Sequence, residues 1–101
     1  MSGDTSTDEQ TPWFVYLVEC SDGTLYCGAT TDVSRRVTEH NRGTASRYTR
    51  GRRPVVLVSQ APCPDRGSAL VLEAAVKRLP RKEKRVFLET RNGEHPGELI
   101  E

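Results

Sequence analysis

The stretch WFVYLVECSDGTLYCGA, residues 13–29, decides the fold of this chain. Its two ends are rich in β-branched and aromatic residues, which favour the pleated surface of a sheet. Residues 21–23, Ser-Asp-Gly, have turn chemistry, because glycine adopts a positive φ at little cost. The pattern therefore predicts two adjacent antiparallel strands, Trp13–Cys20 and Thr24–Ala29, joined by a tight turn.

Three polar side chains follow one another every ten residues, and a fourth comes four residues later. Tyr16 lies in the first predicted strand and Tyr26 in the second, and Arg36 and His40 come next, in a segment with N-cap chemistry at residues 31–32. Residues four apart in a helix face the same side. We therefore expect two phenols, a guanidinium and an imidazole to converge. Taken singly, each has a structural alternative: a half-buried strand tyrosine, a surface arginine or a histidine at a helix end.

The elements after this stretch predict an α+β class: a small, largely antiparallel three-stranded sheet packed by helices. A helix should run from Asp32 to about Arg42 and close at Gly43, with Asn41 serving the helix end rather than the site. A polar, arginine-rich loop should follow over residues 44–53. The apolar run of residues 55–58 predicts a third strand that is central or covered, because apolar residues occupy both of its faces.

Two further helices are expected in the second half of the chain. One starts at Asp65 or Ser68 and has apolar residues at helical spacing until Pro80 ends it. Pro80 also opens a basic helix that continues through Glu89.

Charge is segregated along the chain. The net charge of the 101 residues is +1, yet all fifteen basic residues lie between Arg35 and Arg91. Residues 1–12 and 92–101 contain six acidic residues and no lysine or arginine, so residues 13–91 carry a net charge of +7. We predict one domain over residues 13–91, between a disordered acidic tail over 1–12 and an acidic tail over 92–101. Its charge favours a polyanionic partner.

Cysteine usage and hydropathy exclude several classes of protein. Cys20, Cys27 and Cys63 are odd in number and lack paired metal-ligand spacing, which favours free thiols in a reducing compartment. No apolar run reaches the roughly 18 residues that cross a bilayer. We expect a soluble, cytoplasmic protein.

These motifs resemble those of the GIY-YIG nuclease domain over residues 13 to about 89. The first family tripeptide corresponds to residues 14–16, Phe-Val-Tyr, without its glycine, and the second corresponds to residues 26–28, Tyr-Cys-Gly. Arg36 and His40 match the arginine of the family's helix and its His-or-Tyr position. The short stand-alone bacterial members and the catalytic domain of the Slx-type nuclease are the most similar.

Glu73 resembles the metal-binding glutamate of the same family. Its apolar neighbours predict partial burial, and a buried carboxylate needs a cation, for which one Mg²⁺ or Mn²⁺ ion is suited. The alternative is an ion pair with Lys77 one turn later. The excision-repair member has a lysine three residues after its second tyrosine, where this chain has Ala29.

The resemblance implies a metal-dependent endonuclease that hydrolyses DNA phosphodiester bonds. Structure-selective rather than sequence-selective cleavage is expected, because no second domain for sequence recognition is evident, and branched and single-stranded DNA are candidate substrates. The predicted catalytic residues are Tyr16, Tyr26, Arg36, His40 and Glu73. The predicted DNA-binding residues are Arg35, Arg42, Arg47, Arg50, Arg52 and Arg53, since arginine suits bidentate phosphate contacts.

Two points stay open from the sequence. One tyrosine would be the general base, with its pKa lowered by the surrounding positive charge, and the other would orient water or phosphate; the sequence leaves either assignment possible. The alternative function is a nucleic-acid-binding module with the same fold and little turnover, acting with a larger protein partner.

Overall fold

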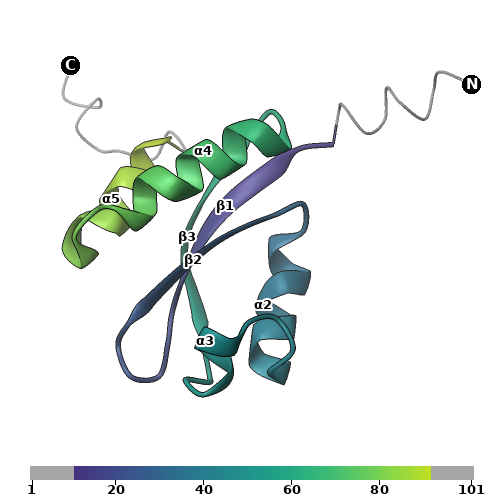
Figure 1. Cartoon of the computed structure of the whole chain (residues 1–101), viewed down its shortest axis with the longest axis vertical. Coiled ribbons are helices and arrows are strands. Elements are labelled where there is room, and N and C mark those ends of the chain that lie inside the picture. Colours follow the sequence, from purple (N-terminus) through teal and green to yellow (C-terminus); the bar gives the residue numbers. More distant parts are fainter. Residues whose placement is uncertain (1–10, 92–101) are drawn as a thin grey trace, which may run out of the picture.

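The structure, a computed structural model, describes residues 11–91 and contains a three-stranded antiparallel sheet between two layers of helices (Figure 1). The strands are β1 (Trp13–Glu19), β2 (Leu25–Thr30) and β3 (Val56–Cys63), in the order β2-β1-β3. The helices are α2 (Val33–Arg42), α3 (Arg47–Arg50), α4 (Arg66–Lys77) and α5 (Arg81–Arg91). The predicted α+β class is confirmed. The predicted tails lie outside the described residues, apart from positions 11 and 12.

The β1–β2 hairpin has the predicted antiparallel pairing. Tyr16 pairs with Gly28, and Val18 pairs with Tyr26. The turn closes with a hydrogen bond from Cys20 N to Thr24 O, and Gly23 adopts a φ of 86°. Both tyrosines therefore lie on neighbouring strands, within reach of one set of partners.

The alternation of side chains along β1 divides the core between the two faces of the sheet. Val15 and Leu17 pack with α4 and α5, whereas Tyr16 and Val18 point toward the side that α2 covers. All four are buried. Burying an aliphatic side chain of this size contributes roughly 1.5–3 kcal/mol, so the central strand anchors both layers. Because successive side chains of a strand point to opposite faces, the Tyr16 hydroxyl lies on the α2 side of the sheet.

The helix after β2 begins and ends as predicted. Asp32 is the N-cap, and its carboxylate accepts a hydrogen bond from Arg35 N at 3.0 Å. Gly43 closes the helix in the left-handed region, with a φ of 84°. His40 lies in the last turn and is almost completely buried, so the cap positions fix where its ring enters the site.

The third strand differs from its prediction. β3 is longer than residues 55–58 and lies at an edge of the sheet, so the central position is wrong, whereas both faces are partly covered, because Leu57 and Val58 pack against the two core clusters. Val55 is buried, but Val56 is 63% exposed. An apolar run does not show whether a strand has one neighbour or two, and β1 occupies the centre because both other strands pair with it.

The predicted loop over residues 44–53 contains a short helix, α3. Ser46 is its N-cap and accepts a hydrogen bond from Thr49 N at 3.1 Å. Asn41 also differs from its predicted helix-end role. Its side chain bonds the backbone N and O of Val55, so it joins the end of α2 to the start of β3.

The second helix pair is confirmed. α4 starts after the N-cap Asp65, and its predicted apolar positions Ala69 and Val76 are fully buried against the sheet. Cys20, Cys27 and Cys63 are buried free thiols. Within residues 11–91, no helix has the length and apolar character needed to cross a membrane.

Candidate active site

A cavity of about 290 Å³ opens between the β1–β2 hairpin, α2 and α4. All five residues predicted to be catalytic line it: Tyr16, Tyr26, Arg36, His40 and Glu73. The sequence separation between the first and last of them is 57 positions, so only the fold brings them together. A larger groove of about 730 Å³ runs along α5 but contains none of these residues. The chemistry therefore concentrates in the smaller cavity.

Tyr16 and His40 form the buried centre of this cavity. The hydroxyl of Tyr16 lies 2.8 Å from Nε2 of His40, and both side chains are at most 2% exposed. Gly28, the partner of Tyr16 across the strands, lies directly beneath the phenol, where a Cβ atom would overlap the hydroxyl. The glycine of the Tyr-Cys-Gly motif thus makes room for the tyrosine of the first strand.

Burial determines the protonation of this pair. Desolvation raises the pKa of Tyr16 above its ordinary value of 10.0, and the neighbouring Tyr26 adds to the rise, while the charge of Arg36 and its hydrogen bond to the phenol act against it. The positive charge of Arg36 thus acts in the expected direction on this phenol, but desolvation is the larger effect and the pKa of Tyr16 is raised. Burial, followed by the charge of Arg36, lowers the pKa of His40 below 6.5.

These protonation states give the hydrogen bond its direction. At neutral pH Tyr16 carries its proton and His40 is neutral. The guanidinium of Arg36 can only donate, so Nε2 of His40 is the acceptor that a buried phenol proton requires. The other ring nitrogen, Nδ1, then carries the imidazole proton and lies 2.7 Å from Oγ1 of Thr49.

Tyr26 lines the cavity beside His40. Its ring meets the edge of the His40 ring at a centroid distance of 5.1 Å and stacks on Tyr48 of α3 at 5.8 Å. Within residues 11–91 its hydroxyl has no hydrogen-bond partner. It is therefore available to water or to a bound phosphate.

Glu73 lies on the α4 side of the cavity and is only 17% exposed. Lys77 forms an ion pair with it at 3.0 Å, and this hydrogen bond raises the pKa of Lys77. The carboxylate thus has a cationic partner, as the structural alternative predicted, and it also faces Tyr16 and Tyr26 across the cavity. Because the Lys77 side chain is 54% exposed, it can turn into solvent and release the carboxylate.

Sequence reasoning missed two residues of the site. Arg66 lines the cavity from α4, two helical turns before Glu73, a spacing that could have indicated it. Thr49 is fully buried beneath His40. Its only sequence signal is a serine three residues earlier, which is typical of a helix N-cap.

The six predicted DNA-binding arginines differ in the partners that their side chains have. Arg52 pairs with Asp22 at 3.0 Å and lies over the Tyr48 ring, and Arg53 donates to the carbonyl of Arg50, so both hold the loop together. Arg35 is exposed and has a longer ion pair with Glu39, at 3.8 Å. Within the described part of the chain, no carboxylate lies within ion-pair distance of the remaining three, which are Arg42, Arg47 and Arg50.

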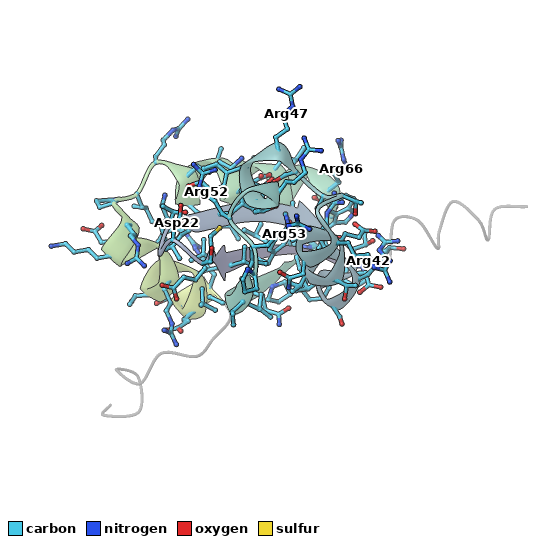
Figure 2. All side chains as sticks on the ribbon, turned by 90° about the horizontal axis from the view of Figure 1, so that it is seen from below. Asp22, Arg42, Arg47, Arg52, Arg53 and Arg66 are labelled. Carbon is cyan, nitrogen blue, oxygen red and sulfur yellow. The ribbon has the colours of Figure 1, made fainter. Side chains whose placement is uncertain are left out.

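Figure 2 shows Arg47 and Arg66 extending from the same side of the domain, with Arg52 directed toward Asp22. Arg47 comes from α3 and Arg66 from the first turn of α4. Arg66 is itself a lining residue of the cavity, and Arg47 follows the lining residue Ala45 by two positions. Exposed guanidinium groups therefore come from two segments that adjoin the cavity lining.

The sequence matches one family of known proteins over most of its length. Residues 12–86 match the model of the GIY-YIG catalytic domain, about three quarters of the chain. The chain belongs to the GIY-YIG family. The GIY-YIG catalytic domain has a nuclease-like fold, so the recognised motifs and the observed sheet lead to the same classification.

Relatives of this GIY-YIG chain include small proteins of the UPF0213 group. It is 51% identical to a UPF0213 protein of Nitratidesulfovibrio vulgaris over 82 residues, 81% of this chain and 74% of the relative. It is 52% identical to UPF0213 protein DP2720 of Desulfotalea psychrophila over 77 residues, 75% of this chain and 70% of the relative. The solution structure of EF2693 from E. faecalis superimposes with a TM-score of 0.58 at 39% identity, covering 87% of this chain and 94% of that one.

GIY-YIG nucleases typically use a divalent metal, and the donor set of this cavity fits one. Within residues 11–91, no group of three or more His, Cys, Asp or Glu side chains converges as a metal cage. Mg²⁺ does not need a cage, because it commonly binds one or two carboxylates and completes its shell with water and substrate phosphate. A single partly buried carboxylate at the cavity wall, Glu73, matches this mode.

The buried histidine predicts an acid-dependent loss of stability. Because the pKa of His40 is lowered in the folded chain, the unfolded chain binds more protons below about pH 6.5, and the free energy of unfolding falls as the pH falls. Thermal melts between pH 7.5 and 5.0 should show this slope in the wild type and a shallower slope in His40→Gln. His95→Gln, which alters the other histidine, is the matched control. Equal slopes for wild type and His40→Gln would contradict the assignment.

Proposed function

We propose that this protein is a metal-dependent endonuclease that hydrolyses DNA phosphodiester bonds. The observation that supports it most is the convergence of Tyr16, Tyr26, Arg36, His40 and Glu73 on one cavity. Phosphodiester hydrolysis needs a base for water, positive charge for the phosphoryl oxygens and stabilisation of the leaving oxygen. This cavity holds a candidate for each.

Tyr16 is the general base in this proposal, because it is the tyrosine that is hydrogen-bonded to a neutral imidazole. Its oxygen takes a proton from the attacking water as its own phenol proton passes to Nε2 of His40. The transfer avoids a free phenolate, which burial disfavours. The water oxygen bonds to phosphorus, the bond from phosphorus to the leaving oxygen breaks, and the leaving oxygen gains a proton from solvent.

The other cavity residues hold the substrate in place. Arg36 lines the cavity beside Tyr16, where it can stabilise the nonbridging oxygens. Tyr26 offers an unpaired hydroxyl that can orient water or phosphate. Glu73 would hold the divalent ion, which when bound supplies Lewis-acid stabilisation of the leaving oxygen.

The substrate is expected to be recognised by shape and backbone. Arg42, Arg47, Arg50 and Arg66 are exposed arginines of α2, α3 and α4 that have no carboxylate within ion-pair distance among the described residues. Contacts to phosphate position a protein on DNA without reading its sequence. Branched or single-stranded DNA is the proposed substrate class, since a cavity this small admits one phosphate of an accessible strand more readily than a stacked duplex.

A nicking assay tests the proposal. Supercoiled plasmid and labelled linear, nicked, flapped, branched and single-stranded substrates are incubated with Mg²⁺, with Mn²⁺ and with EDTA. Cleavage that requires the metal and varies with substrate geometry is expected. Binding of all substrates without any cleavage would favour the binding module instead, a function for which the Glu73–Lys77 ion pair is the supporting observation.

The loop arginines predict the salt dependence of binding. Replacing Arg47 and Arg50 together by alanine should flatten the slope of log affinity against log salt by about one unit for each phosphate that the variant no longer binds. Titrations of a fluorescent flap substrate at several salt concentrations measure this slope. Arg52→Ala should instead lower the melting temperature, because it removes the ion pair with Asp22.

Arg85→Ala on α5 is the matched control for those titrations. Arg85 is exposed as well, with 62% of its side chain in solvent, but it pairs with Glu89 on α5, which contributes no residue to the cavity lining. The neighbouring Lys84 donates hydrogen bonds to the carbonyls at the end of α4, so its ammonium group is not free to bind phosphate. If the salt slope changed in Arg85→Ala and not in the loop variant, α5 rather than the loop would be the DNA-binding surface.

A further inference from the structure

Beneath His40 lies a second, fully buried polar contact that the proposed reaction does not use directly. Oγ1 of Thr49 is 2.7 Å from Nδ1 of His40, on the opposite side of the ring from Tyr16. Thr49 has no exposed surface. A hydroxyl in this position can either accept a hydrogen bond from Nδ1–H or donate one to an unprotonated Nδ1. The two directions correspond to opposite tautomers of the imidazole.

The cap of α3 decides between these choices. Oγ of Ser46 lies 3.0 Å from Oγ1 of Thr49, and the Ser46 carbonyl lies 3.5 Å from it. Either hydroxyl can donate to the other, but the Ser46 carbonyl can only accept, so it is the fixed acceptor for the Thr49 hydroxyl proton. With that proton directed to Ser46, the lone pairs of Oγ1 are left to accept from Nδ1–H of His40. Nε2 is then an unprotonated acceptor facing Tyr16.

The segment that carries Thr49 is fastened to the hairpin. The backbone of Ser21 donates to Arg52 O at 2.9 Å, and the Arg52 side chain bonds Asp22 and the carbonyl of Tyr48. Its guanidinium also lies 4.0 Å from the centroid of the Tyr48 ring, which in turn stacks on Tyr26. The arginine next to α3 thereby holds Thr49 at a fixed depth below the imidazole.

We propose that Thr49 is a positioning residue that fixes the tautomer of His40, so that Nε2 can receive the phenol proton of Tyr16. The proposal rests on the proposed function for its consequence in catalysis, but the tautomer itself exists without substrate. In the free protein, His40 carries its proton on Nδ1. A hydroxyl at position 49 is required for this state, and its methyl group is not.

Nitrogen-15 NMR of the imidazole tests the tautomer directly. In wild-type protein at pH 7.5, two-bond correlations should show the His40 proton on Nδ1. In Thr49→Val, which keeps the size of the side chain, the proton should move to Nε2, and in Thr49→Ser it should return to Nδ1. His95→Gln in each background leaves one imidazole to observe.

A proton on Nε2 in the wild type would overturn the proposal whether or not any variant folds. So would a Thr49→Val spectrum identical to that of the wild type. For cleavage, we expect Thr49→Val to lower the single-turnover rate by about tenfold or more, as for misplaced acid–base chemistry, and Thr49→Ser to restore it. If wild type cleaves nothing yet the tautomers shift as expected, the nuclease function fails and the positioning role stands.

Discussion

Glu73→Gln is expected to lower the single-turnover rate of DNA cleavage by about 10³-fold, because the carboxylate that would hold the divalent ion is removed while the side chain keeps its size. DNA affinity should be as high as that of the wild type or higher, since a carboxylate repels phosphate. Cleavage and binding are measured on one flap substrate. Titration with Mn²⁺, followed by the EPR signal of the free ion, should show that the variant no longer binds the metal.

Lys77→Met separates the metal site from the ion pair. Both variants remove the 3.0 Å ion pair between the two side chains, but only Glu73→Gln removes the metal ligand. Lys77→Met should therefore keep cleavage and bind Mn²⁺ at least as tightly, because the ammonium group no longer competes for the carboxylate. Equal decreases in activity and melting temperature in both variants would mean that Glu73 is a structural partner of Lys77.

The hairpin and its two tyrosines could be predicted from the sequence because the relevant signals are local. Alternation along residues 13–19 sets which face each side chain occupies, and Gly23 and Gly43 mark chain reversals that require positive φ. The four-residue spacing of Arg36 and His40 likewise indicates that both side chains lie on the same side of α2. Local chemistry thus indicated which side chains could meet.

The sequence could not indicate properties that depend on the packed environment of a group, such as a pKa, a buried contact or the position of a strand in the sheet. The charge around Tyr16 can be read from neighbouring residues, but desolvation, which outweighs it, depends on how deeply the packed fold buries the phenol. Thr49 lies nine positions from His40 in a segment with few hydrophobic residues, and its role exists only because α3 folds back under the imidazole. The edge position of β3 likewise follows from pairing, which a single apolar run does not encode.

Tyr16→Phe is expected to lower the single-turnover cleavage rate by about 10²- to 10⁴-fold, the contribution that a positioned general base typically makes. The variant should fold, since only a hydroxyl is removed. Its melting temperature should nevertheless fall, because Nε2 of His40 is left buried without its partner, which costs about 1–3 kcal/mol. Rates are therefore compared at a temperature at which thermal melts show every variant to be folded.

The other two tyrosines provide matched controls for this experiment. Tyr48→Phe removes a hydroxyl outside the cavity and should cleave at the wild-type rate, and Tyr26→Phe should be less impaired than Tyr16→Phe, because its hydroxyl contacts no imidazole nitrogen. The wild-type rate should rise with pH through the lowered pKa of His40 and then level off, because only the neutral imidazole accepts the phenol proton. The same rise in Tyr16→Phe, or a larger decrease in Tyr26→Phe, would transfer the role of base to Tyr26 and leave Tyr16 as the residue that orients His40.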